Sequence, residues 1–277
     1  MTTPTPNPNP LKHPFDRIRT VLQDKGPLAV ALSGGLDSSV LLAAAVRVLG
    51  AEHCLAVTAE TPYVMREELH DGMELCRSLG VRREVLALPI PEAVRNNPPL
   101  RCYLCKHALF TALMQKAASL GFPLVADGSN TDDLSDYRPG RKALQELGVA
   151  SPFLEAGLGK ADIRRLARFL DLPETVSEKP AYACLMTRLE HDRPVTEELL
   201  RRVDEAETFL RSRGLAGCRV RVHGDELARI ELPAASCGAL WQGRQADDIA
   251  RHLKTLGFRY ITLDLEGYSR GSMNQPS

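Results

Sequence analysis

A short polar loop lies between two apolar stretches near the N-terminus and has the sequence Ser33-Gly34-Gly35-Leu36-Asp37-Ser38-Ser39. Its glycines permit positive φ angles and leave the backbone uncovered, so successive N–H groups can form a nest for an anion. The flanking residues predict a strand before the loop and a helix after it, and the positive helix end would strengthen the same site. An ordinary glycine-rich turn with a capping serine is the alternative. The full pattern favours a phosphate-binding loop, which lacks the Lys-Ser/Thr ending of a Walker A motif.

The side chains of this loop suggest how phosphates would be held. Ser33, Ser38 and Ser39 supply hydroxyl donors. Asp37 is a hard oxygen ligand and would contact Mg²⁺ directly or through water, because a phosphate chain needs a cation to neutralise its charge.

Three cysteines indicate a second kind of chemistry. Cys102 and Cys105 form a Cys-x-x-Cys pair just before a predicted helix, and Cys184 lies between Lys179 and Arg188, whose charges favour a thiolate. The pair alone fits half a zinc site, a redox pair or part of an iron–sulfur site. Three thiolates on a four-iron cluster leave one iron open for a sulfide, whereas three on zinc leave a position for water. Cys184 as a small buried residue is the alternative.

The remaining cysteines lie in or beside apolar elements without a cysteine neighbour and are interpreted as structural; they are Cys54, Cys76, Cys218 and Cys237.

Composition limits the possible partners. The chain has 277 residues, of which 44% are hydrophobic, and its 35 basic residues balance 35 acidic ones. This balance provides no overall basic field for nucleic acid. No apolar run is long enough to cross a bilayer, and residues 1–12 are predicted to be a disordered tail rather than a signal peptide. Seven cysteines without an export signal favour the reducing cytoplasm. We expect a cytoplasmic protein with no nucleic-acid or membrane partner.

Strands and helices alternate through residues 13–175, which predicts an α/β domain with a parallel sheet flanked by helices. The expected strands are 28–32, 53–58, 84–88 and 123–127. The expected helices are 15–25, one that opens at the loop 33–39 and runs through residue 49, and 66–79, 106–120 and 161–170. Ligands in such folds sit at the carboxyl ends of the strands, where Asp127 ends one of them.

A smaller α+β domain is expected over residues 195–277, after a proline-containing junction at 176–194 that carries Cys184. Its expected elements are a helix at 196–213, strands at 219–222 and 227–232, a helix at 247–256 and a strand at 260–265. Domain junctions are common places for active sites.

Several motifs taken together resemble the LarE family of ATP-dependent sulfur transferases, within the PP-loop ATP pyrophosphatase superfamily. Besides the loop at 33–39, the matching stretches are RCYLCK (101–106), DGSNTDDLSDYRPG (127–140), GVASPFLEAGLGKADIR (148–164), KPAYACLMTR (179–188) and RVRVHGDELARIE (219–231). They follow the family order and cover most of residues 28–232.

The matching motifs contain Arg188, Arg219 and Arg221, for which the resemblance implies an anionic ligand. Each arginine can bind a carboxylate or phosphate through two parallel hydrogen bonds, and Glu231 could orient them or meet a positive ligand charge. Solvated surface arginines with buried stems are the alternative.

The resemblance implies a reaction in the biosynthesis of the nickel-pincer nucleotide cofactor of lactate racemase. ATP adenylates a carboxylate of pyridinium-3,5-dicarboxylate mononucleotide, and a protein-borne sulfur then displaces AMP to leave a thiocarboxylate. Some members sacrifice the sulfur of one cysteine. In other members three cysteines hold a four-iron four-sulfur cluster. Cys102, Cys105 and Cys184 resemble the second type.

The resemblance also implies roles for individual residues and a homo-oligomer, either trimer or hexamer. ATP and Mg²⁺ would be bound by the loop, with Gly34 and Gly35, and by Asp127. The small nucleotide substrate would be bound by Arg188, Arg219, Arg221 and Glu231.

Two other functions fit part of the pattern. A tRNA thiolase shares the loop, a cysteine set and adenylation, but the neutral charge and the absence of an appended RNA-binding module disfavour it. A binding partner without turnover is disfavoured by the intact loop and the complete cysteine set.

Overall fold

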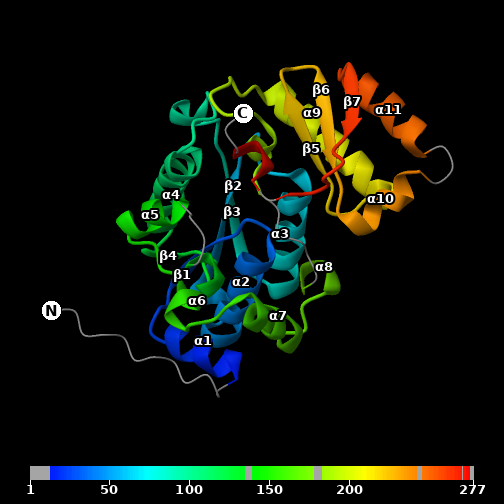
Figure 1. The fold of residues 1–277 in the computed structure, drawn as a ribbon. Coiled ribbons are helices and arrows are strands. Elements are labelled where there is room, and N and C mark those ends of the chain that lie inside the picture. The colour runs from blue at the N-terminus through cyan, green and yellow to red at the C-terminus, as the bar shows by residue number, and fades with distance from the viewer. Residues whose placement is uncertain (1–12, 135–138, 178–182, 242–244, 270, 275–277) are drawn as a thin grey trace. The chain divides into compact units, whose positions relative to one another are not determined.

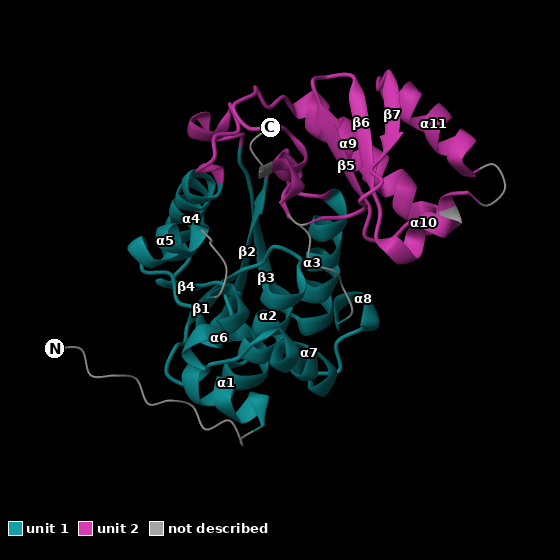
Figure 2. Ribbon diagram, viewed as in Figure 1, with its two compact units in different colours: residues 1–60, 66–88, 102–182 teal, residues 61–65, 89–101, 183–277 magenta. Residues whose placement is uncertain are grey.

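The computed structural model describes residues 13–134, 139–177, 183–241, 245–269 and 271–274 (Figure 1). The chain divides by its internal contacts into two compact units (Figure 2). Unit 1 comprises residues 1–60, 66–88 and 102–182, and unit 2 comprises residues 61–65, 89–101 and 183–277. The tail predicted at 1–12 and Lys179 of the predicted junction lie outside the described residues.

Unit 1 contains a four-stranded parallel sheet, as the sequence predicts. Its strand order is β3 (Arg82–Ala87), β2 (Cys54–Glu60), β1 (Leu28–Ala31), β4 (Leu124–Ala126). In the register, Val30 of β1 pairs with Ala56 of β2 on one side and Ala126 of β4 on the other. Central strands covered on both faces are apolar throughout, which explains why β1 shows no polar alternation.

The helices of unit 1 cover both faces of this sheet (Figure 1). They are α1 (Pro14–Leu22), α2 (Leu36–Leu49), α3 (Arg66–Leu79), α4 (Arg101–Ser119), α5 (Pro139–Glu146), α6 (Pro152–Glu155), α7 (Lys160–Phe169) and α8 (Glu174–Ser177). Short 3-10 turns of unit 1 are η1 (Ala51–His53) and η3 (Thr131–Leu134), whereas η2 (Glu92–Val94) lies in a segment of unit 2.

Two apolar cores lie on opposite sides of the sheet because successive strand residues point to opposite faces. Val30 belongs to the core that includes residues of α1, α2 and α7. Its neighbour Ala29 belongs to the core that includes Phe110 and Leu113 of α4. Cys54 and Cys76 are buried in the first core, as expected of structural cysteines.

Most helix positions in unit 1 agree with the sequence prediction, with one correction that concerns the site. α2 ends at Gly50, whose φ of 91° suits a residue without a side chain. The helix predicted to begin at Lys106 begins instead at Arg101, whose N–H bonds to the carbonyl of Pro98. The Cys-x-x-Cys pair therefore lies within the first turn of α4 rather than before it.

Unit 2 has a three-stranded mixed sheet of β5 (Arg219–His223), β6 (Leu227–Glu231) and β7 (Tyr260–Leu263). β5 and β6 are antiparallel, whereas β6 and β7 are parallel. The other elements are η4 (Leu185–Arg188), α9 (Glu197–Ser212), α10 (Ala234–Leu240), α11 (Gln245–Thr255) and η5 (Ser272–Asn274). α10 is an addition to the predicted order.

Alternation along β5 determines which side chains of unit 2 reach its polar face. Val220 and Val222 are buried among apolar residues, so Arg219 and Arg221 point to the opposite face of the sheet. The register pairs Arg219 with Glu231 and Arg221 with Arg229 on that same face. One side of the small sheet thus carries a row of charged residues.

Two short segments of the N-terminal part, residues 61–65 and 89–101, belong to unit 2. The sequence prediction assigned both to the first domain. Their long-range hydrogen bonds account for the difference, since Tyr63 accepts from the Leu185 N–H and Arg95 from the Val195 N–H.

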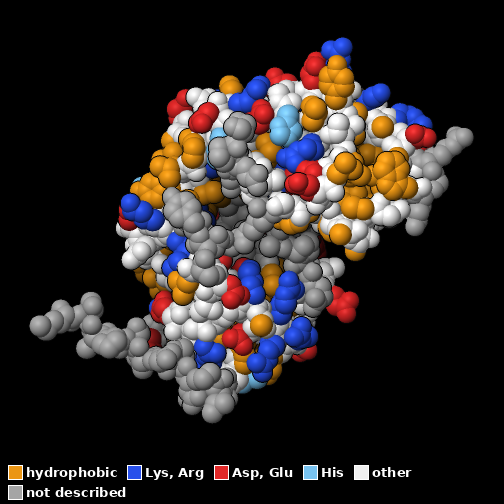
Figure 3. All heavy atoms as spheres, in the orientation of Figure 1, with side chains coloured by type: hydrophobic (Ala, Val, Ile, Leu, Met, Phe, Trp, Pro, Cys, Tyr) orange, Lys and Arg blue, Asp and Glu red, His pale blue; other side chains and the backbone are white. Residues whose placement is uncertain are grey.

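No helix among the described residues is long and apolar enough to cross a bilayer. Basic and acidic side chains are interspersed over the visible face of unit 1 in Figure 3, in agreement with the zero net charge.

Candidate active site

The predicted phosphate loop follows β1 and leads into α2, and its own side chains hold it closed. The Ser38 hydroxyl accepts from the Ser33 N–H at 3.2 Å and donates to the Gly35 carbonyl at 3.2 Å. The Ser33 hydroxyl lies 3.1 Å from the Ser38 hydroxyl and accepts from the Gly35 N–H. This shape leaves the first turn of α2, with its outward N–H groups and positive dipole end, free to meet an anion.

Two glycines allow neighbouring backbone to pack against this loop. Gly34 has a φ of +80°, and a Cβ there would overlap the carbonyl group of Glu68 in α3. Gly128, in the loop after β4, lies so close that a Cβ would sit 2.9 Å from both the Asp37 Cβ and the Ser38 N. The loops after β1 and β4 therefore touch at the carboxyl edge of the sheet.

Lys160 contacts the carboxylate of Asp37. Its backbone N–H donates to Asp132 Oδ2 at 2.7 Å, and the Thr131 N–H donates to the Leu158 carbonyl at 3.0 Å. These bonds fix the start of α7 opposite the phosphate loop. The ammonium and the carboxylate are both partly exposed, which leaves them able to exchange partners when a charged ligand arrives.

Asp127 is held within the protein. Its two carboxylate oxygens accept from the hydroxyls of Ser129 and Ser151, and the side chain is buried. Asn130 accepts the Asp132 N–H at 3.1 Å through its side-chain oxygen and so caps the short turn η3 that follows. Sequence reasoning missed Ser151; a serine directly before the first residue of α6, Pro152, was the available signal.

Cys102 and Cys105 lie three residues apart in the first turn of α4, and side chains at this spacing share a helix face. Cys102 is exposed and Cys105 is buried. Both belong to unit 1, whereas Cys184 belongs to unit 2 and is half-buried. Over the ranges that the structure describes, no three His, Cys, Asp or Glu side chains are grouped to hold a metal ion.

Three of the cysteines outside this set, Cys54, Cys76 and Cys218, are strongly desolvated. Desolvation raises the pKa of Cys54 and of Cys76 to about 11, and that of Cys218 to about 12. Such thiols stay protonated at neutral pH and are poor nucleophiles.

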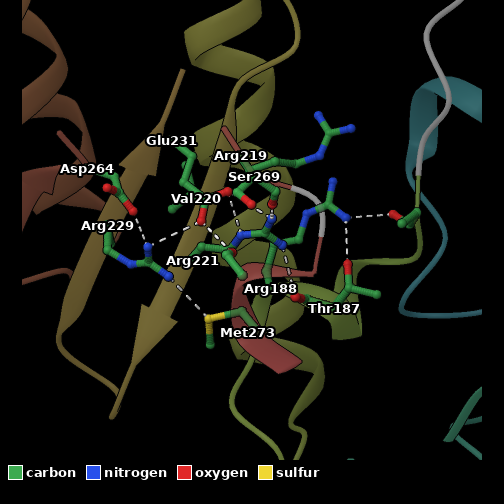
Figure 4. A network of polar contacts seen from close by, with 12 residues as sticks. Thr187, Arg188, Arg219, Val220, Arg221, Arg229, Glu231, Asp264, Ser269 and Met273 are labelled. Atoms are coloured by element: carbon green, nitrogen blue, oxygen red, sulfur yellow. Dashed lines mark hydrogen bonds and ion pairs between the residues drawn. The ribbon is translucent and has the colours of Figure 1, made fainter. Parts of the chain in front are cut away.

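Arg188 holds the turn that begins at Cys184 (Figure 4). Its Nη1 donates to the carbonyls of Ala183 at 2.7 Å and Cys184 at 3.3 Å, and to the Thr187 hydroxyl at 2.9 Å. That hydroxyl donates in turn to the Cys184 carbonyl at 2.8 Å. The arginine therefore fixes the backbone of the cysteine.

The other side of this guanidinium pairs with Glu207 of α9. Arg188 Nε donates to Oε1 at 2.8 Å and Nη2 to Oε2 at 3.0 Å, and both side chains are 0% exposed. Burial is the largest influence on Glu207 and opposes its ionisation. The charge and hydrogen bonds of Arg188, the charge of Arg219 and the Val220 N–H together outweigh burial and lower the pKa of the carboxyl. All three nitrogens of Arg188 donate within the protein, so it supports the site from inside.

Sequence reasoning missed Glu207. Its signal was a carboxylate at helical spacing between Val203 and Leu210, on the face of α9 that is otherwise apolar and buried.

Among the predicted arginines of unit 2, Arg221 pairs directly with Glu231, and Arg188 and Arg219 lie beside this pair (Figure 4). Arg221 donates from Nε to Glu231 Oε2 at 3.0 Å and from Nη1 to the Thr187 carbonyl at 3.0 Å. Arg219 donates to the Cys218 carbonyl at 2.7 Å. Burial, together with the charge of Arg188, lowers the pKa of Arg219. Buried positive charges of this kind are stabilised by an anion.

The fold and the phosphate loop together define a class. A parallel sheet, a Ser-Gly-Gly-x-Asp-Ser loop after β1 and a second loop packed on it are the features of a PP-loop nucleotide-binding domain. In agreement, residues 13–98 match the family described as NAD synthase.

Comparison with known proteins identifies the family within this class. The chain is 38% identical over 255 residues to the pyridinium-3,5-bisthiocarboxylic acid mononucleotide synthase of Lactiplantibacillus plantarum, with 91% of each chain covered. It is 37% identical to an uncharacterised protein of Synechocystis sp., covering 96% of this chain and 98% of the other. An uncharacterised protein of Methanocaldococcus jannaschii is 30% identical over 87% of this chain and 90% of its own. The chain belongs to the LarE family of ATP-dependent sulfur transferases, which confirms the resemblance of its motifs.

Proposed function

We propose that the protein uses ATP to convert the carboxylates of pyridinium-3,5-dicarboxylate mononucleotide into thiocarboxylates, for the nickel-pincer nucleotide cofactor of lactate racemase. The observation that carries the proposal is the similarity over 91% of the chain to the named synthase of L. plantarum. The phosphate loop and Cys184 with its buried support supply the two chemical functions that such a reaction needs.

Unit 1 activates the carboxylate. A substrate carboxylate oxygen attacks the α-phosphorus of ATP, the bond to the oxygen that bridges to the β-phosphorus breaks, and pyrophosphate leaves. The N–H groups at the start of α2 and the ammonium of Lys160 stabilise the negative charge on the departing phosphates.

The oxygen chemistry of this edge fits magnesium. Asp37 already meets a cation, the ammonium of Lys160, and its carboxylate with nearby hydroxyls is the kind of ligand that Mg²⁺ prefers. When bound, magnesium would neutralise the pyrophosphate charge.

Cys102, Cys105 and Cys184 would hold a four-iron four-sulfur cluster, because a set composed only of thiols suits iron–sulfur ligation. When bound, such a cluster would supply a sulfide at its fourth iron. Sulfur attacks the acyl carbon of the adenylate, the bond from that carbon to the AMP oxygen breaks, and AMP leaves. The same two steps at the second carboxylate complete the product.

Arg219 and Arg221 bind the anionic groups of the substrate, with Glu231 holding Arg221 in place. The lowered pKa of Arg219 supports this role, because a second buried cation beside Arg188 gains most from an anion. Arg188 acts by holding the Cys184 turn.

The protein acts in the cytoplasm as a homo-oligomer, trimer or hexamer, with no nucleic-acid partner. Seven free cysteines fit a reducing compartment, and the neutral charge disfavours RNA.

The test is anaerobic purification with iron and sulfide assay, followed by incubation with Mg-ATP and the pyridinium dicarboxylate nucleotide. AMP and thiocarboxylate should form with the native protein and with Cys237→Ala, a cysteine outside the set. Cys184→Ala should form no thiocarboxylate. If an iron-free protein instead loses the mass of one H₂S during the reaction, the sulfur comes from a sacrificed cysteine and the proposed cluster is wrong. Thiolation of tRNA alone would overturn the proposal.

A further inference from the structure

Asn97 is a buried polar residue that the reaction does not use. It is 0% exposed and has a φ of +49°, in the left-handed region that asparagine tolerates better than most residues. It lies in unit 2, in the segment 89–101, and precedes Cys102 by five positions in the chain.

The amide group of Asn97 binds the backbone of the turn that starts at Cys184. Nδ2 donates to the carbonyls of Met186 at 3.2 Å, Leu189 at 3.1 Å and Glu190 at 2.8 Å. These carbonyls span η4 and the residues after it, so one side chain sets the curvature of the whole turn.

Further hydrogen bonds hold the same two segments together. The Asp192 N–H donates to the Asn97 carbonyl at 3.3 Å, and the Val195 N–H donates to the Arg95 carbonyl at 2.7 Å. Arg101 Nη1 lies 2.9 Å from the Nδ1 of His191. The segment that follows Cys184 is thus bound along its length to the segment that leads directly into Cys102.

We propose that Asn97 is the positioning residue that fixes the Cys184 turn to segment 89–101, which leads into the Cys-x-x-Cys helix, and that the proposed three-cysteine site depends on this fixation. The inference rests on the proposed three-cysteine function. Three constraints select asparagine here: a left-handed backbone, a buried side chain, and N–H donors aimed at carbonyls. A carboxylate at this position would instead point oxygen atoms at three carbonyl oxygens, so Asn97→Asp preserves the size of the side chain and removes its donors.

The test measures thiol proximity rather than activity. Full-length protein, reduced and free of iron, is treated with dibromobimane, which joins two thiols only when they lie within a few ångströms, and crosslinked peptides are measured by mass spectrometry. In the native protein we expect Cys184 joined to Cys102 or Cys105. Asn97→Asp and Asn97→Gly should lower that yield about tenfold, the effect of losing one buried hydrogen-bonded group.

The matched control is Thr196→Ala, which removes the hydroxyl that caps α9 through the Leu199 N–H and weakens unit 2 without touching the turn. The control should keep the native crosslinking yield, and all variants should keep the native affinity for ATP. Equal yields in the native protein and the Asn97 variants would overturn the inference, as would an equal loss in Thr196→Ala. Absence of the crosslink in the native protein would overturn the three-cysteine function itself.

Discussion

The phosphate loop of unit 1 and the Arg188–Glu207 pair of unit 2 both gather charge, but by opposite means. The loop relies on backbone N–H groups, and the charged side chains of Asp37 and of Lys160 in α7 stay partly exposed. The pair relies on side chains that are removed from water, with Arg188 and Glu207 both 0% exposed. The first arrangement suits a ligand that enters and leaves, and the second suits a turn that must not move.

The energetic consequence differs in the same way. An exposed ion pair contributes little to stability because water already solvates both charges. A buried pair is costly to break because the remaining partner is left as an uncompensated charge. Substitution of an exposed charge at the phosphate loop should therefore reduce activity at nearly constant stability, and substitution in the buried pair should reduce stability first.

The largest effect is expected for Gly34→Ala. The added Cβ would overlap the Glu68 carbonyl group, and a φ of +80° strains any side chain. We expect ATP-dependent pyrophosphate release to fall by at least about a thousandfold, equivalent to roughly 4 kcal/mol. The measurement is a coupled pyrophosphate assay at saturating substrate.

Gly80→Ala is the matched control for this substitution, because Gly80 also has a positive φ, +63°, but has no atom within 4 Å of the added Cβ. It should cost about 1 kcal/mol of stability and leave pyrophosphate release unchanged. Equal losses in both variants would show that backbone strain, rather than the shape of the phosphate loop, limits activity.

Glu207→Gln should have the next largest effect. Removal of the charge leaves Arg188 buried without its ion partner, at a cost of about 3–5 kcal/mol in the free energy of unfolding. Urea denaturation checks this value. Glu198→Gln, which breaks the exposed pair with Arg201 on the same helix, should cost less than about 1 kcal/mol. Similar losses in the two variants would remove the distinction between the buried and the exposed pairs.

Lys160→Met should act on ATP with little change in stability. Its ammonium lies at the phosphate loop, so we expect the KM for ATP to rise about tenfold, equivalent to roughly 1.4 kcal/mol. The melting temperature should stay near the native value because the pair with Asp37 is partly exposed. Lys142→Met, which breaks an exposed pair with Glu146, should change neither quantity. An unchanged KM in Lys160→Met would exclude this lysine from the phosphate site.

The smallest effect is a dependence of stability on acid pH. The pKa of Glu207 is lower in the folded protein than in the unfolded chain, because Arg188, Arg219 and the Val220 N–H together outweigh the opposing effect of burial. Its contribution to stability is complete above the unfolded pKa, about 4.3, and is lost as the pH falls through the lower folded value. Urea midpoints measured between neutral and acid pH should therefore decline more steeply in the native protein than in Glu207→Gln. Parallel declines would contradict this linkage.

The sequence predicted the local elements of both units better than the contacts that support Cys184, for a physical reason. Local patterns predict elements such as α2 and α3. Gly50 marks the end of α2, and apolar residues at helical spacing mark α3 at Arg66–Leu79. The support of Cys184 depends on residues far away in the chain, such as Asn97 and Glu207. Hydrogen bonds across such separations leave no local pattern to recognise.

The role of Arg188 shows the same limit. Its place in a motif predicted a substrate contact, but the sequence does not reveal that Glu207 and the carbonyls of Ala183 and Cys184 occupy its nitrogens. An arginine in a motif can serve the site by holding the backbone that presents another residue.

The central claim is that unit 1 adenylates a carboxylate and that sulfur then displaces AMP. The most direct measurement of this claim follows the fate of a carboxylate oxygen. The substrate is prepared with oxygen-18 in its carboxylates and incubated with the native protein and Mg-ATP in ordinary water. Mass spectrometry of the AMP should show one heavy oxygen, because the carboxylate oxygen stays on phosphorus when the carbon–oxygen bond breaks. AMP without the heavy isotope would mean that water attacks ATP directly and would contradict the account.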